Sequence, residues 1–225
     1  LAISAGSALD LSWADAHVAA IIDSFYPGAR GGKAVAEAIF GDFSPSGKLP
    51  VTFYQGTENL PEFTDYDMSD RTYRYTDKNV LYPFGYGLHY GTIRYENAQI
   101  SCAQCGVRDA VDVSVDVINE SSYTIHESVQ AYIQHEEADA YEPGYQLKGI
   151  QTVTLQPKET KRVTISLKAR DFAIITQEGE CVVRPGSYRI AIGGQQPDAR
   201  SAKLTGSDVA TLVVRREGAQ TPVEY

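Results

Sequence analysis

The feature that most constrains the fold is a strict alternation of valine with polar residues between positions 111 and 117. Valine occupies every second position, and Asp or Ser stands at each position between. Because successive side chains of a β-strand point to opposite faces, this pattern predicts a strand with one buried and one solvated face. The valine face of such a strand requires a second layer of structure to cover it.

Further short apolar runs follow along the chain, at 129–134, 147–155, 163–167, 182–183, 188–192 and 211–214. Turn-forming pairs such as Pro143-Gly144 and Pro185-Gly186 separate these runs. Together with the alternating stretch they predict an all-β, immunoglobulin-like or fibronectin-like sandwich of about seven strands. Everything after about residue 95 is expected to be strand or turn, so we predict one domain at 1–90 and a second at 91–225.

Residues 1–90 mix helix and strand signals. The apolar run 18–25 predicts a buried strand of a parallel sheet, with a helix as the alternative interpretation. Residues 33–40 predict a short helix that Gly41 caps. Residues 49–53 predict an extended segment that returns beside the earlier strand, which would give a βαβ-like unit. The Tyr-, Asp- and Arg-rich stretch 57–90 lacks periodicity and is expected to form surface loops.

Charge and hydropathy exclude several classes of function. The 20 basic and 29 acidic residues give a net charge of −9, which disfavours binding to nucleic acid or to anionic lipid. The apolar runs are much shorter than the ~20 residues of a membrane-spanning helix, so no membrane span is expected. The first residues resemble a strand and have no signal-peptide pattern, so we expect further sequence upstream.

Motifs for cofactors and metals fail in detail. The stretch from Gly41 to Leu49 has five residues between its glycines instead of the four of a phosphate-binding loop, and Leu49 replaces the magnesium-binding hydroxyl. The four histidines lack the close helical spacing of a metal pair. Cys102 and Cys105 are expected to form a local disulfide or to be two inert thiols, instead of a redox centre. No cofactor is therefore predicted.

A series of longer motifs resembles glycoside hydrolase family 3. The series is more specific as an ordered set than any of its members, and it consists of Tyr26-Pro27-Gly28, Pro45-Ser46-Gly47-Lys48-Leu49-Pro50, Arg71-Thr72-Tyr73-Arg74-Tyr75 and Tyr82-Pro83-Phe84-Gly85-Tyr86-Gly87-Leu88. The motifs Leu147-Lys148-Gly149 and Arg184-Pro185-Gly186-Ser187-Tyr188 resemble those of the fibronectin type III-like domain that follows in this family. His89 departs from the pattern, because the family usually has Ser at that position.

This resemblance implies a β-glycosidase whose catalytic groups lie outside the chain. The family carries its aspartate nucleophile on a (β/α)₈ barrel and its glutamate acid/base on an α/β sandwich, and residues 1–90 resemble the end of that sandwich. The implied parent is a retaining, exo-acting β-xylosidase or β-glucosidase that is secreted or periplasmic. It would remove terminal β-linked sugars from oligosaccharides. Two opposed carboxylates perform this chemistry, and we expect no catalytic residue here.

The resemblance also implies which partners and which substrate the chain contacts in the parent enzyme. Its expected partners are the N-terminal barrel, the upstream α/β sandwich segments and, through the parent enzyme, the oligosaccharide. The candidate substrate-binding residues at the border of the cleft are Asp70, Arg71, Tyr73, Arg74 and Tyr75. Alternatively, the arginines stack on the tyrosines in a packed hinge between domains. Two other functions remain open: a non-catalytic module that binds carbohydrate or a partner protein, and one half of a split glycosidase.

Overall fold

A computed structural model describes residues 1–58, 60–76, 78–139 and 142–224. In the N-terminal part, β1 (Ala2–Ile3) pairs in parallel with β2 (Ile22–Asp23), and α1 (Ser12–His17) connects them. The helix α2 (Gly31–Phe40) ends at Gly41, whose φ of 81° is the left-handed conformation that favours glycine. The predicted helix and its glycine cap are therefore confirmed.

A βαβ unit is present, but it consists of β1, α1 and β2. The prediction that residues 33–40 form the helix of such a unit, between strands at 18–25 and 49–53, is wrong. The strand expected over 18–25 shortens to the two residues of β2. The segment 49–53 runs to β3 (Phe53–Tyr54), which pairs antiparallel with β4 (Val80–Tyr82) and not with β2. The apolar pattern missed α1 because Ala14 is its one buried residue.

The stretch 57–90, of which residues 59 and 77 lie outside the described part, is mostly loop as predicted. It also contains the short helix α3 (Thr72–Tyr75) and the strand β4. Leu81 of β4 is 3% exposed and packs with Phe53, Leu11 and Ala14 in a small apolar cluster. This cluster is the core of the N-terminal part. The stretch 57–90 is therefore only partly surface loop.

Two packed sheets form the second part, as predicted. The smaller has the order β10 (Thr160–Leu167), β7 (Val111–Asn119) and β5 (Ile93–Ile100), and the larger has the order β6 (Gln104–Gly106), β14 (Ala210–Glu217), β13 (Gly186–Gly193), β8 (Ile125–His135) and β9 (Gln146–Leu155). The four valines of β7 have no exposed surface. They lie in one cluster with Leu155 and Ile190 of the other sheet, so the alternating pattern is confirmed as an inward-facing strand.

Smaller elements complete the sandwich. A third sheet joins β11 (Ile174–Ile175), β12 (Cys181–Val183) and β15 (Thr221–Pro222), next to the 3₁₀ helix η1 (Ala169–Phe172). Every predicted run lies on a strand, but the expectation of strands alone after residue 95 is wrong. The helix α4 (Ala199–Thr205) follows β13, and Asp198 caps it by accepting hydrogen bonds from the amides of Arg200 and Ser201.

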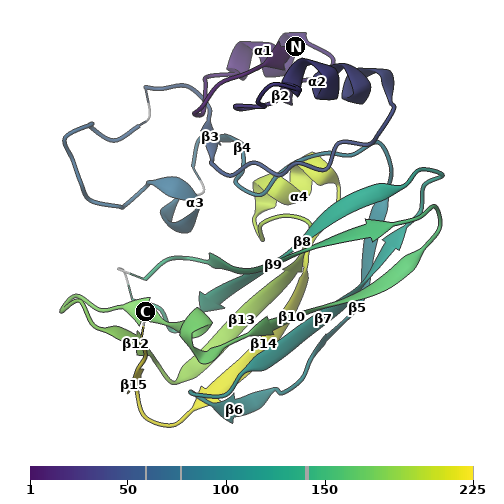
Figure 1. Ribbon diagram of the computed structural model, residues 1–225. Helices are drawn as coiled ribbons and strands as arrows, with labels where there is room; N and C mark the ends of the chain where they lie inside the picture. The colour runs from purple at the N-terminus through teal and green to yellow at the C-terminus, as the bar shows by residue number, and fades with distance from the viewer. Residues whose placement is uncertain (59, 77, 140–141, 225) are drawn as a thin grey trace.

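The helix α4 lies between the N-terminal elements and the sandwich (Figure 1). Its Arg200 donates to the carbonyl oxygen of Leu81 through Nε and Nη2, at 3.0 and 2.9 Å. On the neighbouring strand β8, Gln130 Nε2 donates to the carbonyl of Gly85 at 3.0 Å. The backbone of 81–85 is therefore held by side chains of the sandwich.

A buried ion pair joins the two parts. Lys48 Nζ lies 3.1 Å from Oε1 of Glu127, and the Glu127 side chain is 1% exposed. His89 Nε2 lies 3.5 Å from the other carboxylate oxygen. Because a carboxylate is costly to bury without a cation, Lys48 and Glu127 depend on each other for their position. The lysine of the Pro45–Pro50 motif thus has a structural role.

Candidate functional site

The predicted site residues lie on and before α3, where the chain passes from the N-terminal part toward β9. Arg71 holds the loop that precedes the helix. Its guanidinium donates to the carbonyl oxygens of Glu62, Asp65 and Asp67 at 2.9, 2.7 and 3.0 Å. All three acceptors belong to the chain itself, so the contacts seen for Arg71 are structural.

Asp70 and Thr72 flank this arginine in an unusual backbone conformation. Their φ angles are 57° and 56°, in the left-handed region that residues other than glycine rarely adopt. The Asp70 carboxylate lies 3.1 Å from Nζ of Lys78, and both side chains are exposed. The amide of Thr72 donates to the Tyr54 hydroxyl at 2.9 Å. These contacts set the direction in which α3 leaves the loop.

Tyr73 lies in an aromatic cluster on the sandwich. Its ring stacks on Phe84 with 4.1 Å between centroids, and it meets Tyr132 edge-on at 6.2 Å and Tyr145 at 6.3 Å. Its hydroxyl accepts a hydrogen bond from the amide of Leu147 at 3.1 Å. Since Phe84 covers one face of the ring, the cluster matches the hinge interpretation of Tyr73.

Arg74 and Tyr75 line a pocket of about 360 Å³ at the edge of the sandwich. Within the described part of the chain, Asp70, Arg71 and Tyr73 do not line it. Arg74 also stands over the Tyr73 ring, with Cζ 5.8 Å from the centroid. Arg74 therefore contacts the Tyr73 ring and also lines the pocket, and the five predicted residues divide into separate groups.

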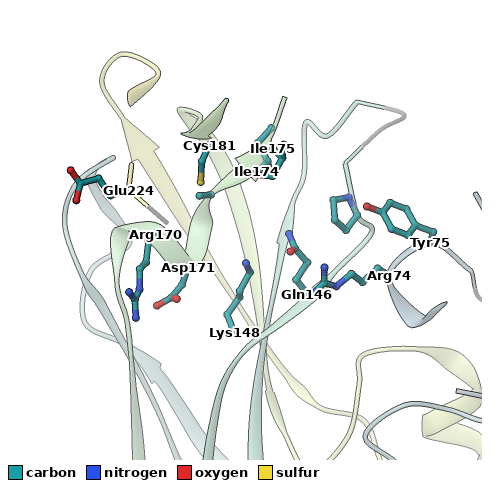
Figure 2. Close-up of a pocket in the computed structure, with 12 residues that line it drawn as sticks. Arg74, Tyr75, Gln146, Lys148, Arg170, Asp171, Ile174, Ile175, Cys181 and Glu224 are labelled. Atoms are coloured by element: carbon teal, nitrogen blue, oxygen red, sulfur yellow. The ribbon is translucent and has the colours of Figure 1, made fainter. Parts of the chain in front are cut away.

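The other walls of the pocket come from the sandwich. Gln146 and Lys148 of β9 are two positions apart and therefore share one face of the strand. Arg170 and Asp171 come from η1, and Cys181 begins β12. Figure 2 shows Gln146 and Lys148 beside Arg74, with Glu224 on the opposite side. A ligand in this pocket would touch both α3 and the sandwich.

Sequence reasoning missed Lys148 and Gln146 as site residues. Lys148 belongs to a motif that identified the domain, but that resemblance assigned no role to its side chain. The available signal was a polar residue at alternate positions of a predicted strand, next to the apolar Leu147. The facing element, α3, is distant in the sequence, so the signal could not indicate a pocket.

The electrostatics of the pocket centre on Lys148. Burial lowers the pKa of its amine, and the nearby positive charge of Arg74 lowers it further, while Asp171 acts in the opposite direction. Asp171 Oδ2 also accepts a hydrogen bond from the amide of Lys168 at 2.7 Å. The pocket therefore brings two cations close together at its α3 side.

A second charged group supports the loop that faces α3. Glu142 is 8% exposed and accepts from Arg184 Nη1 at 2.5 Å, while His135 Nδ1 lies 2.9 Å from its other oxygen. Two residues later, the amide of Gly144 donates to the carbonyl oxygen of Arg74 at 2.8 Å. These contacts hold the backbone of Arg74 against the sandwich.

Cys102 and Cys105 are free thiols in the structure, so it shows the thiol alternative and not the disulfide. Burial raises the pKa of Cys105, although the nearby guanidinium of Arg216 acts against this. Arg216 is 1% exposed and also donates to the carbonyl oxygens of Val107 and Asp109, at 3.0 and 2.7 Å. These contacts show that Arg216 and Cys105 are packed at the end of the strands.

Among the described helices, none is long and apolar enough to cross a membrane.

Comparisons with known proteins match both parts of the chain. Residues 1–90 match the glycosyl hydrolase family 3 C-terminal domain, and residues 127–196 match the fibronectin type III-like domain. The two matches together cover more than half of the chain. They confirm the predicted fold class, an α/β segment followed by a fibronectin type III-like sandwich.

Individual relatives agree with this assignment. A xylan 1,4-beta-xylosidase from Xylanibacter ruminicola is 35% identical over 89% of this chain and 23% of its own length. A periplasmic beta-glucosidase from Salmonella typhimurium is 31% identical over 86% of this chain and 27% of its own length. The solved structure of a beta-glucosidase from Erythrobacter marinus matches 96% of this chain and 28% of its own, with 32% identity and a TM-score of 0.80.

The chain thus spans about a quarter of the length of these relatives. It contains a family 3 C-terminal domain followed by a fibronectin type III-like domain, in the order that the motifs indicate. The chain belongs to glycoside hydrolase family 3, and it corresponds to the C-terminal portion of the enzymes of that family.

Proposed function

We propose that this chain is the C-terminal, non-catalytic portion of a retaining, exo-acting β-glycosidase that removes terminal β-linked sugars from oligosaccharides. The observation that carries the proposal is the ordered match of both domains to beta-xylosidases and beta-glucosidases. Hydrolysis with retention needs an acid/base and a nucleophile about 5–5.5 Å apart. The proposal assigns those two carboxylates to the rest of the enzyme, and scaffold to this chain.

Exposed apolar side chains in the N-terminal part support a scaffold role. Seven of them lie on the short helices α1 and α2 or in loops of this part: Trp13, Tyr26, Ile39, Phe40, Phe43, Phe63 and Tyr66. Large exposed apolar side chains mark surfaces that bind other protein segments. The proposed partners are the N-terminal barrel and the upstream α/β sandwich segments of the same enzyme. The short parallel pair of β1 and β2 would then be part of a larger sheet.

The border of the cleft forms the second part of the proposal. Asp70, Arg71, Tyr73, Arg74 and Tyr75 would stand beside the oligosaccharide, with Arg74 and Tyr75 the best placed because they line an open pocket. Arg71 and Tyr73 would act indirectly by holding α3. A secreted or periplasmic location goes with this function and has support from the periplasmic relative.

The test compares the 225-residue chain with the longer protein on aryl β-xylosides and aryl β-glucosides. We expect hydrolysis only from the longer protein, and an enzyme-like rate from the chain alone would overturn the scaffold role. In the longer protein, we expect Arg74→Met to raise KM with little change in the melting temperature. An unchanged KM with a lower melting temperature would reduce Arg74 to a hinge residue.

A non-catalytic binding module is the second candidate, and the open pocket at the sandwich edge favours it. Titration of the 225-residue chain with xylo- and cello-oligosaccharides tests it, since a module binds without the catalytic domains. A split enzyme predicts instead that the chain co-purifies with a separate barrel polypeptide.

A further inference from the structure

The pocket between α3 and the sandwich combines positive charge with a sugar-sized volume. Arg74, Lys148 and Arg170 contribute three cations to its lining, against two acids, Asp171 and Glu224. The protein as a whole is acidic, with a net charge of −9, so this local excess of cations runs against the overall charge. Such a site attracts an anion from solution.

Among the described residues, neither of the two cations at the α3 side, Arg74 and Lys148, forms an ion pair. The guanidinium of Arg74 contributes to the lowered pKa of Lys148, although the charge of Asp171 offsets part of this effect. Like charges held close together repel each other, and a bound anion between them would remove this repulsion. A carboxylate suits the planar fork of an arginine especially well.

Three neighbouring groups suit a sugar ring better than a bare inorganic anion. Tyr75 and Pro143 offer apolar surface, and the Gln146 amide offers both a donor and an acceptor for hydroxyl groups. Sugar-binding sites need such a combination of an apolar face with a few polar groups. In Figure 2, Gln146 lies between Lys148 and Arg74, so a ligand beside Gln146 can reach all three.

We propose that this pocket binds the carboxylate-bearing unit of an acidic saccharide, a hexuronate, with Arg74 and Lys148 on its carboxylate and Tyr75 beside its ring. The inference rests on the proposed function, because it supposes that the enzyme acts on glycans. It goes beyond that function by naming the class of glycan unit that the pocket holds. The pocket would retain an acidic side unit of the substrate.

The experiment titrates the 225-residue chain with D-glucuronate, D-glucose, acetate and inorganic phosphate, with NMR chemical shifts as the readout. We expect saturable glucuronate binding, with a dissociation constant on the order of 1 mM. Glucose, acetate and phosphate should bind at least about tenfold more weakly, since each lacks either the charge or the ring. Glucuronate should also raise the pKa of Lys148, measured from the shift of its Cε resonance.

Variants locate the site. Arg74→Met and Lys148→Met keep the aliphatic stems and should each weaken glucuronate binding about tenfold or more. Arg108→Met and Lys203→Met remove exposed cations that do not line the pocket and should leave binding unchanged. Circular dichroism spectra and melting curves of all four variants confirm that they are folded.

Three results would overturn the proposal: no saturable binding of glucuronate, equal binding of acetate or phosphate, or equal losses in the control variants. These results are separate from the test of the proposed function. If the longer protein fails to hydrolyse aryl glycosides while the chain still binds glucuronate, the proposed enzyme falls and the site remains. If hydrolysis holds without glucuronate binding, only the site is removed.

Discussion

In the sandwich, the four valines of β7 have no exposed surface, whereas Phe40, Phe63 and Tyr66 of the N-terminal part are 84%, 92% and 89% exposed. The strands that pair in the two main sheets mostly run for eight to eleven residues, but β1, β2 and β3 have two each. A strand of two residues has too little surface to bury a large core. The sandwich thus holds the larger core, and the N-terminal part buries few apolar side chains by itself.

Truncating one isoleucine in each part should show the largest difference in stability between the two parts. Ile190 of β13 is 0% exposed, and Ile190→Ala should reduce the free energy of unfolding by about 4 kcal/mol, because it leaves a cavity in the core. Ile39 of α2 is 57% exposed, and Ile39→Ala should change stability by less than about 0.5 kcal/mol. Urea unfolding followed by circular dichroism measures both. Equal losses would contradict the distinction between the two parts.

The buried ion pair tests how much the N-terminal part depends on the sandwich. Lys48→Met removes the lysine cation from the buried Glu127 carboxylate, which keeps His89 as a neighbour, and should cost about 3 kcal/mol. Hydrogen exchange should accelerate at the amides of Leu49 and Gly85, which bond across the two motif loops.

The matched control for this variant is Lys33→Met, because Lys33 is exposed and, among the described residues, forms its ion pair with the neighbouring Glu37 of α2. It should have almost no effect on either measurement. A double variant, Lys48→Met with Glu127→Leu, removes both charges and should recover most of the lost stability. If it does not, the loss comes from packing and not from the unpaired carboxylate.

Alkaline pH should affect the sandwich through its buried tyrosines. Burial raises the pKa of Tyr188 to about 12, and the charge of Glu142 contributes. Since the unfolded phenol has a pKa of about 10, the unfolded chain releases this proton first, and stability falls as the pH rises from about 10 to 12. The expected slope from this group is at most about 1.4 kcal/mol per pH unit, measured by urea unfolding at several pH values.

Tyr188→Phe should flatten that slope, although it also lowers stability at every pH by removing the hydrogen bond to the Arg184 carbonyl oxygen. Tyr66→Phe changes a residue that is 89% exposed and should leave the slope unchanged. Equal slopes in the parent and in Tyr188→Phe would mean that Tyr188 is not buried in solution.

The smallest effect concerns the end of α2. Gly41 has a φ of 81°, so Gly41→Ala places a side chain in a left-handed conformation and should cost about 1 kcal/mol. Gly47 has open space around the position of a Cβ and no positive φ, and Gly47→Ala should be close to neutral. Thermal unfolding of the two variants provides the comparison.

Local patterns predicted the parts of the fold that local physics governs. The alternation in β7 follows from the period of a strand, and the cap at Gly41 follows from its freedom of backbone conformation. Neither depends on which segment lies opposite. The pairing of β3 does depend on this, because β3 and β4 lie far apart in the sequence, with α3 between them. The βαβ prediction failed at that point.

In the candidate site, too, the sequence predicted the segment, but only the tertiary structure separated the surroundings of its residues. The motif from Arg71 to Tyr75 indicated a candidate segment, but its sequence alone could not separate Arg71, bound to carbonyl oxygens of its own loop, from Arg74 at the pocket. Their side chains are chemically identical, so only their surroundings distinguish them.

By itself, the sequence determined the family, the two-part architecture and the inward-facing strand, because each depends on motif order or on periodicity along the chain. The tertiary structure alone decided that Lys48 pairs with Glu127 and that the charge of Arg74 acts on Lys148. These pairs are 79 and 74 residues apart in the sequence. The physical reason is that charge interactions depend on distance in space, which the packing of the sandwich against the motif loops sets.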